Sequence, residues 1–166
     1  MYHLTEAYLL ASLICATAAY LGALLFGAGG VAPLVVRTLG EDAAGPLLRA
    51  FWPRFHGFAV AAGTVIMLCV AVGSVFSAVP SLYALLVVSL CALMTVCFLI
   101  GWRLIPAINS ARDSGAEAEF ARLHRLDVAL VGAGMLLALL VIALLVYVLP
   151  GQFTFWPSAG GDLHHA

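Results

Sequence analysis

Long stretches that lack Asp, Glu, Lys and Arg are the feature that most limits how this 166-residue chain can fold. They cover residues 7–36, 55–102 and 128–161, and the second contains the turn sequence Val79-Pro80-Ser81 near its middle. One helical crossing of a bilayer takes about 20 apolar residues. Four crossings with short connections therefore fill the chain as a single membrane domain. Because so short a turn places the crossings that it joins antiparallel, we predict an all-α fold, an antiparallel bundle of four transmembrane helices.

The overall composition also indicates that the chain lies in a lipid bilayer. Hydrophobic residues make up 64% of the chain and charged residues 9%, against about 25% charged in soluble domains. The lipid bilayer is therefore the first predicted partner. Nucleic acid is excluded as a partner because the net charge of -1 provides no basic surface that would neutralise phosphates.

The boundaries of the crossings follow from the polar residues between them. We predict crossings over residues 6–36, 54–78, 82–103 and 115–149, followed by an external tail over 150–166.

Two features outside the apolar cores are also expected to be helical. Leu47, Leu48 and Phe51 recur at helical spacing, which predicts a short helix within 41–52 that lies in the membrane interface. Ser114 and Glu117 have the spacing of a capping box that begins the last helix. That helix would be about 50 Å long, against about 30 Å of hydrocarbon, so its first turns should project from the membrane.

All of the arginines fall on the connection between the first two crossings or on the connection between the last two. Positively charged loops remain in the cytoplasm. We therefore predict a multi-pass protein of the inner (cytoplasmic) membrane with both termini on the outer, periplasmic side.

The polar residues near the predicted cytoplasmic ends of the helices form a candidate ligand or docking site. Its members are Arg54, His56, Arg103, Asn109, Arg112, Asp113, His124 and Asp127. No catalytic motif is recognisable, and the apolar parts of the predicted crossings contain none of the ionisable residues that proton pumps use as relays. An enzyme is therefore not the expected class, and no catalytic residue is assigned.

Three functions are compatible with this pattern. The first is a non-enzymatic accessory or scaffold subunit that contacts other membrane subunits, or further copies of itself, through small-residue helix faces such as Ala59 and Gly63. The second is a redox protein in which His56 and His124 together hold haem or a metal ion. The third is a carrier of an anionic lipid or small molecule bound by a ring of arginines. Those arginines are Arg54, Arg103, Arg112 and Arg125.

The redox hypothesis has a possible extension along the third crossing. Cys91, Met94 and Cys97 lie on roughly one side of the predicted helix, and soft sulfur ligands suit Cu(I). The competing interpretation is that these polarizable side chains fill the core. The latter is preferred because no matching sulfur cluster stands on another crossing.

Two sequence elements resemble the family of small membrane proteins similar to transmembrane protein 205, long described as a domain of unknown function. The element nearer the C-terminus consists of Pro106, Ile108, Asn109, Arg112, Asp113, Phe120, Leu123 and His124. The first consists of Gly29, Gly30, Pro33 and Phe51-Trp52-Pro53. The similarity covers roughly residues 20 to 145 and implies a four-crossing fold without implying a reaction. The chain departs from the family pattern at Asp127, where Ser is more usual, and at His56, where an aromatic or small residue is more usual.

Overall fold

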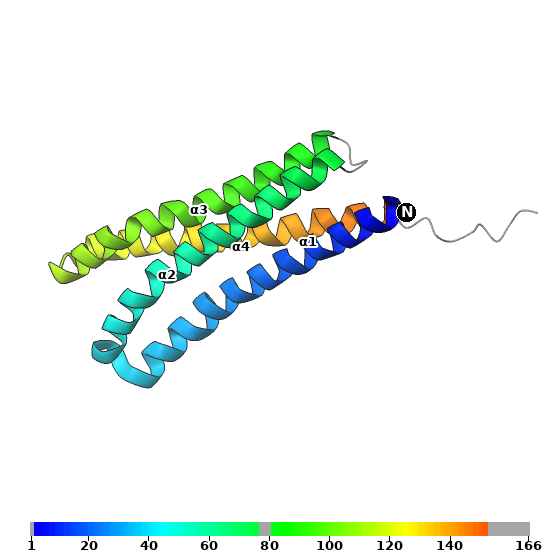
Figure 1. Ribbon diagram of the computed structural model, residues 1–166. Helices are drawn as coiled ribbons and strands as arrows, with labels where there is room; N and C mark the ends of the chain where they lie inside the picture. Colours follow the sequence, from blue (N-terminus) through cyan, green and yellow to red (C-terminus); the bar gives the residue numbers. More distant parts are fainter. Residues whose placement is uncertain (1, 77–80, 153–166) are drawn as a thin grey trace, which may run out of the picture.

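The computed structural model describes residues 2–76 and 81–152, and this part of the chain consists of long helices (Figure 1). They are α1 (Tyr2–Leu25), the π-helix η1 (Phe26–Val31), α2 (Ala32–Phe76), α3 (Ser81–Asp113) and α4 (Glu117–Gln152). Four segments are long and apolar enough to cross a membrane, namely Tyr8–Gly40, Ala43–Val75, Leu82–Asp113 and Glu117–Tyr147. The predicted fold class is thereby confirmed, and the chain is an integral membrane protein. Most of the predicted tail, from residue 153 onward, and most of the turn at 79–81 lie outside the described residues.

The first crossing is built from three consecutive pieces, α1, η1 and the beginning of α2. In η1 the hydrogen bonds reach one residue further than in an α-helix, and at its end the Ala32 N–H donates to the Gly27 carbonyl. The crossing ends at Gly40, whose φ of 71° lies in the left-handed region that glycine adopts without steric cost. The chain reverses direction there, at the elbow of α2 (Figure 1).

The second crossing starts earlier than the sequence indicates. Residues 41–52, expected to form a separate interfacial helix, instead continue directly into residues 53–76 as one helix that contains Pro46 and Pro53. A proline removes one helical hydrogen bond and bends a helix. Packing against neighbouring helices allows a membrane helix to continue through such a bend.

The third crossing is also longer than predicted, because α3 runs through Pro106 to Asp113. It ends in a Schellman motif. The Gly115 N–H donates to the Arg112 carbonyl (3.2 Å) and the Ala116 N–H to the Ala111 carbonyl (3.0 Å). Gly115 takes the left-handed conformation that this motif requires, with φ of 68°. The turn is therefore tight, and α4 begins at Glu117 rather than at 115.

The core lies where α3 packs between α2 and α4, with α1 against α2 and α4. Phe98, Met94 and Cys91 of α3 are fully buried in it. The predicted role of the sulfur side chains as core residues is confirmed for Cys91 and Met94. A Cβ added at Gly134 would collide with the ring of Phe98, so α4 approaches α3 closely only because this position has no side chain.

Candidate ligand site at the arginine-rich end

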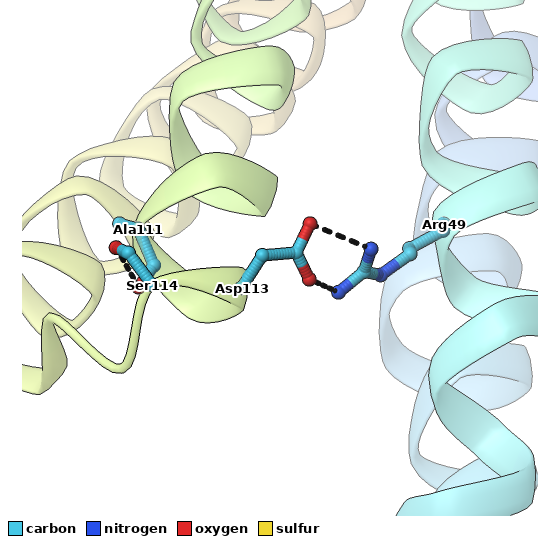
Figure 2. Close-up of polar contacts among 4 residues, drawn as sticks. All are labelled: Arg49, Ala111, Asp113 and Ser114. Atoms are coloured by element: carbon cyan, nitrogen blue, oxygen red, sulfur yellow. Dashed lines mark hydrogen bonds and ion pairs between the residues drawn. The ribbon is translucent and has the colours of Figure 1, made fainter.

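Both connections that carry arginines lie at one end of the bundle, at the left of Figure 1, where the elbow of α2 lies near the turn from α3 to α4. An ion pair joins them. The guanidinium of Arg49 on α2 donates from both terminal nitrogens to the two carboxylate oxygens of Asp113 on α3, with Nη1 to Oδ2 at 3.1 Å (Figure 2). The side chains are 40% and 58% exposed. Partial exposure lets solvent weaken the attraction, although the two-pronged geometry fixes the relative position of the helix ends.

A second pair lies deeper in the bundle. Nε2 of His56 on α2 is 3.1 Å from Oδ1 of Asp127 on α4, and Nδ1 of the same ring is 3.1 Å from the carbonyl oxygen of Trp52. His56 is fully buried and Asp127 is 7% exposed. A buried charge is tolerated only where it is paired and hydrogen-bonded. The two residues therefore act as one unit that joins α2 to α4.

The third helix leaves room for this pair at Gly101. A Cβ built at that position would lie 2.6 Å from Nε2 of His56 and 2.8 Å from Oδ1 of Asp127. Glycine is thus the residue of α3 that lets the imidazole and the carboxylate meet. Sequence analysis did not identify this position as part of the site.

Both ring nitrogens of His56 lie within hydrogen-bonding distance of an oxygen atom, Nδ1 of the Trp52 carbonyl and Nε2 of Oδ1 of Asp127. A carbonyl oxygen only accepts, so Nδ1 donates to Trp52. The ring therefore has a hydrogen-bond partner on each side.

Aromatic rings hold the imidazole in place. Its centroid is 5.5 Å from that of Phe55, 6.1 Å from that of Trp52 and 6.1 Å from that of Phe98. Trp52 precedes His56 by one helical turn, so the two rings lie on the same side of α2. Surroundings of this kind exclude water and strengthen the electrostatic attraction between His56 and Asp127.

A pocket of about 590 Å³ lies beside the pair, between η1, both arms of α2, the end of α3 and the start of α4. Its polar lining comes from Arg37, Arg49, Asn109, Arg112, His124 and Asp127. Its remaining lining is apolar or glycine, namely Ala28, Ala32, Pro33, Val36, Gly45, Leu48, Trp52, Ile105, Ile108, Phe120, Val128 and Val131. Such a volume is typical of small-molecule sites, as is a mainly apolar wall with a few polar groups.

The structure separates the predicted site residues into three groups. Asn109, Arg112, His124 and Asp127 line the pocket, whereas His56 lies behind Asp127 and Asp113 binds Arg49. Neither Arg54 nor Arg103 is a lining residue. Both are exposed, and Arg54 donates to the carbonyl of Ala50 (2.6 Å). The charge cluster in the sequence is therefore larger than the site.

Arg37 and Arg49 were used in the sequence analysis only to assign topology, yet both line the pocket. They stand on opposite sides of Gly40, so the reversal of the chain brings them to one place. A glycine between two basic helical segments is the signal that could have indicated their convergence.

The two internal histidines have different surroundings. The ring of His124 stacks on Phe120, with centroids 5.6 Å apart and planes 2° apart, and the guanidinium of Arg112 lies 5.7 Å from the centroid of the same phenyl ring. Both nitrogens of His56 are occupied by Trp52 and Asp127. A haem iron or metal bound jointly by the histidines would have to displace one of those bonds. Among the described residues no group of three potential ligands for a metal ion is present.

No protein-family model, curated protein or solved structure matches this chain. The resemblance drawn from the two sequence elements stays a prediction. What the fold and the site define is a class, an integral membrane protein of four crossing helices with a mainly apolar, arginine-lined pocket at one end of the bundle.

Proposed function

We propose that this protein binds an amphiphilic anion, a negatively charged group attached to an apolar body, in the pocket at the arginine-rich end. The proposal rests on the residues that line one cavity. Its wall combines apolar side chains from η1, α2, α3 and α4 with three arginines.

The charge of the lining favours an anion. Arg37, Arg49 and Arg112 contribute three positive charges, and Asp127 is the one carboxylate among the lining residues. One oxygen of that carboxylate is already hydrogen-bonded to His56. Guanidinium groups bind phosphate and carboxylate with matched geometry and are more weakly hydrated than ammonium groups. The site therefore attracts an anion even when Arg49 remains bound to Asp113.

The apolar part of the lining favours a ligand with hydrocarbon chains. Val128 and Val131 of α4 face the same cavity as Ile105 of α3 and Ala32 of α2. An ion without an apolar body would leave this surface in contact with water. An amphiphile covers it and keeps its charged group at the arginines.

This proposal develops the carrier hypothesis with a revised set of residues. Arg112 is retained, Arg37 and Arg49 are added, and Arg54, Arg103 and Arg125 fall outside the lining. The accessory-subunit and redox hypotheses remain predictions, because no observation in the described part of the chain specifically favours either.

The test compares two arginines of the same helix. We would measure binding of dioleoyl phosphatidylmethanol, a lipid with one phosphodiester charge, by native mass spectrometry of the protein released from phosphatidylcholine nanodiscs. A charge-assisted hydrogen bond contributes about 1.5–3 kcal/mol. Arg112→Gln should therefore weaken binding about tenfold or more, since tenfold corresponds to about 1.4 kcal/mol.

Arg103→Gln is the matched control, because it removes the same charge from α3 outside the pocket. It should leave the affinity within about twofold of the wild-type value. Equal losses in the two variants, or no loss in either, would contradict the proposed site.

A further inference from the structure

We propose that the amphiphilic anion is a single-chain fatty acid with a hydroxyl near the middle of its chain, and that this hydroxyl donates to Asp127. The inference rests on the proposed function and deepens it. Its basis is that the pocket has arginines at its exposed end and one carboxylate at its buried end.

The two ends of the pocket differ in burial. All three lining arginines are exposed, whereas Asp127 is buried, as are the apolar lining residues Ile105 and Val131. A ligand whose charged group lies at the arginines therefore extends its apolar chain toward Asp127.

Asp127 presents one oxygen to this chain. Oδ1 lies 3.1 Å from Nε2 of His56, and the hydrogen bonds found among the described residues give Oδ2 no partner. In the same part of the chain no fully buried side-chain oxygen or nitrogen is left without a partner, so Oδ2 retains accessible surface. Because the Asp127 side chain is only 9% exposed and lines the pocket, that surface opens into the pocket.

An oxygen in this position requires a donor on the ligand. A plain hydrocarbon chain would exclude water from Oδ2 and offer it no hydrogen, and a buried acceptor without a hydrogen bond weakens binding. A hydroxyl carried by the chain at the level of Asp127 supplies the missing hydrogen. An ammonium would also donate, but a charged group is costlier to bury between apolar side chains than a neutral one.

The spacing of the polar groups indicates where on the chain the hydroxyl lies. The guanidinium of Arg112 lies over the ring of Phe120, 5.7 Å from its centroid. Phe120 and Asp127 are seven residues apart on α4, which corresponds to about 10 Å along the axis. An extended hydrocarbon chain advances about 1.25 Å per carbon, so we expect the hydroxyl about eight to ten carbons from the charged group.

The size of the pocket suits one chain. Its volume is about 590 Å³. A methylene group takes roughly the volume of a liquid water molecule, about 30 Å³, so a chain of about 18 carbons needs about 540 Å³. A phospholipid has two such chains, and one of them would have to remain outside. The volume therefore favours a single-chain acid.

Two isomers of hydroxystearate test the inference, because they have the same charge, length and composition. The mid-chain isomer carries its hydroxyl at carbon ten, and the α-hydroxy isomer carries it next to the carboxylate. One isomer is deuterium-labelled, and both compete for the protein in phosphatidylcholine nanodiscs, with bound ligand read by native mass spectrometry. The wild-type protein should prefer the mid-chain isomer about tenfold, because a hydrogen bond to a charged group contributes at least that factor.

Variants of Asp127 test the acceptor. Asp127→Asn keeps the shape of the side chain and exchanges one acceptor oxygen for an amide nitrogen, so the preference should fall to about twofold or less. Since the isomers also partition differently into the bilayer, the quantity compared is the preference of the wild type relative to that of the variant.

A second variant protects the test against misfolding. The double substitution His56→Leu and Asp127→Leu removes the acceptor without leaving a buried charge unpaired, and it should keep the affinity for plain stearate within about threefold. This variant should bind the mid-chain isomer no better than the α-hydroxy isomer. A preference that survives in both variants, or equal binding of the isomers by the wild type, would overturn the hydroxyl assignment.

Further arms separate this inference from the proposed function. Arg112→Gln should weaken binding of both isomers about tenfold and leave their ratio unchanged. Arginine-dependent binding without an isomer preference overturns the inference and leaves the proposed function intact. The same holds if neither acid displaces dioleoyl phosphatidylmethanol, since the ligand would then be a two-chain lipid. Binding of all these anions that does not depend on Arg112 would instead refute the proposed function.

Discussion

Two ion pairs join α2 to another helix at the same end of the bundle, and they differ in burial. Arg49 and Asp113 meet near the elbow of α2 with substantially exposed side chains, whereas His56 and Asp127 meet in the core with almost none. The outer pair, Arg49 and Asp113, has the better hydrogen-bond geometry, because two bonds join the guanidinium to the carboxylate. The inner pair has the larger consequence, because its groups have no water to replace a lost partner. Burial, rather than the number of hydrogen bonds, decides which pair the fold depends on.

The largest loss of stability is expected when one member of the inner pair, His56 and Asp127, is removed. Asp127→Ala leaves the imidazole of His56 buried without its carboxylate, and breaking such a pair typically costs about 3–5 kcal/mol. The measurement is the unfolding transition in detergent. Replacing both residues by leucine should restore most of the lost stability, because no charge is left buried. A double variant as unstable as the single one would contradict this interpretation of the pair.

A smaller effect is expected from Gly101→Ala, which tests the space that α3 leaves for the pair. The added methyl group would lie within 3 Å of both His56 and Asp127, so the helices must shift. Overpacking of this kind costs about 1–3 kcal/mol. Gly132→Ala is the matched control, since a Cβ there meets no heavy atom within 4 Å. It should be neutral or slightly stabilising, because alanine favours a helix over glycine. Equal melting temperatures for the two variants would show that Gly101 is not a packing constraint.

The smallest effect on stability is expected from the outer pair. Asp113→Asn removes the carboxylate that binds Arg49, but both groups remain in contact with solvent. The melting temperature in detergent should change little, and the difference from wild type should shrink as salt is added. A loss comparable to that of Asp127→Ala would reverse the ranking of the two pairs.

The sequence was sufficient to predict the crossings and insufficient to predict where they end. Charge-free runs define a membrane helix because lipid tolerates no unpaired backbone, and the four apolar segments follow from this. The third crossing is predicted to end at residue 103, yet α3 continues through Pro106 to Asp113. Whether the helix continues to Asp113 depends on its packing against α4, and the local sequence carries no information about that packing.

The candidate site was predicted only in part, because contacts between segments far apart in the chain are not contained in the local sequence. Arg112, Asn109 and His124 were identified because they are polar residues near the predicted cytoplasmic ends of the helices, and they do line the pocket. The pairing of His56 with Asp127, 71 residues apart, depends on the depth of each residue in the bundle. One of the three hypotheses drawn from the sequence brought His56 together with His124 instead.

The wide turn of η1 accommodates one residue more than an ordinary α-helical turn. Successive residues of an α-helix are about 100° apart around its axis, so one residue added to a regular helix would rotate the following stretch by that angle. In the first crossing the wider turn absorbs this rotation within residues 26–31, and Ala32, Pro33 and Arg37 face the cavity that they line. Deleting one residue from 26–31 should therefore convert the turn to ordinary α-helix and leave the same side of the crossing toward the cavity.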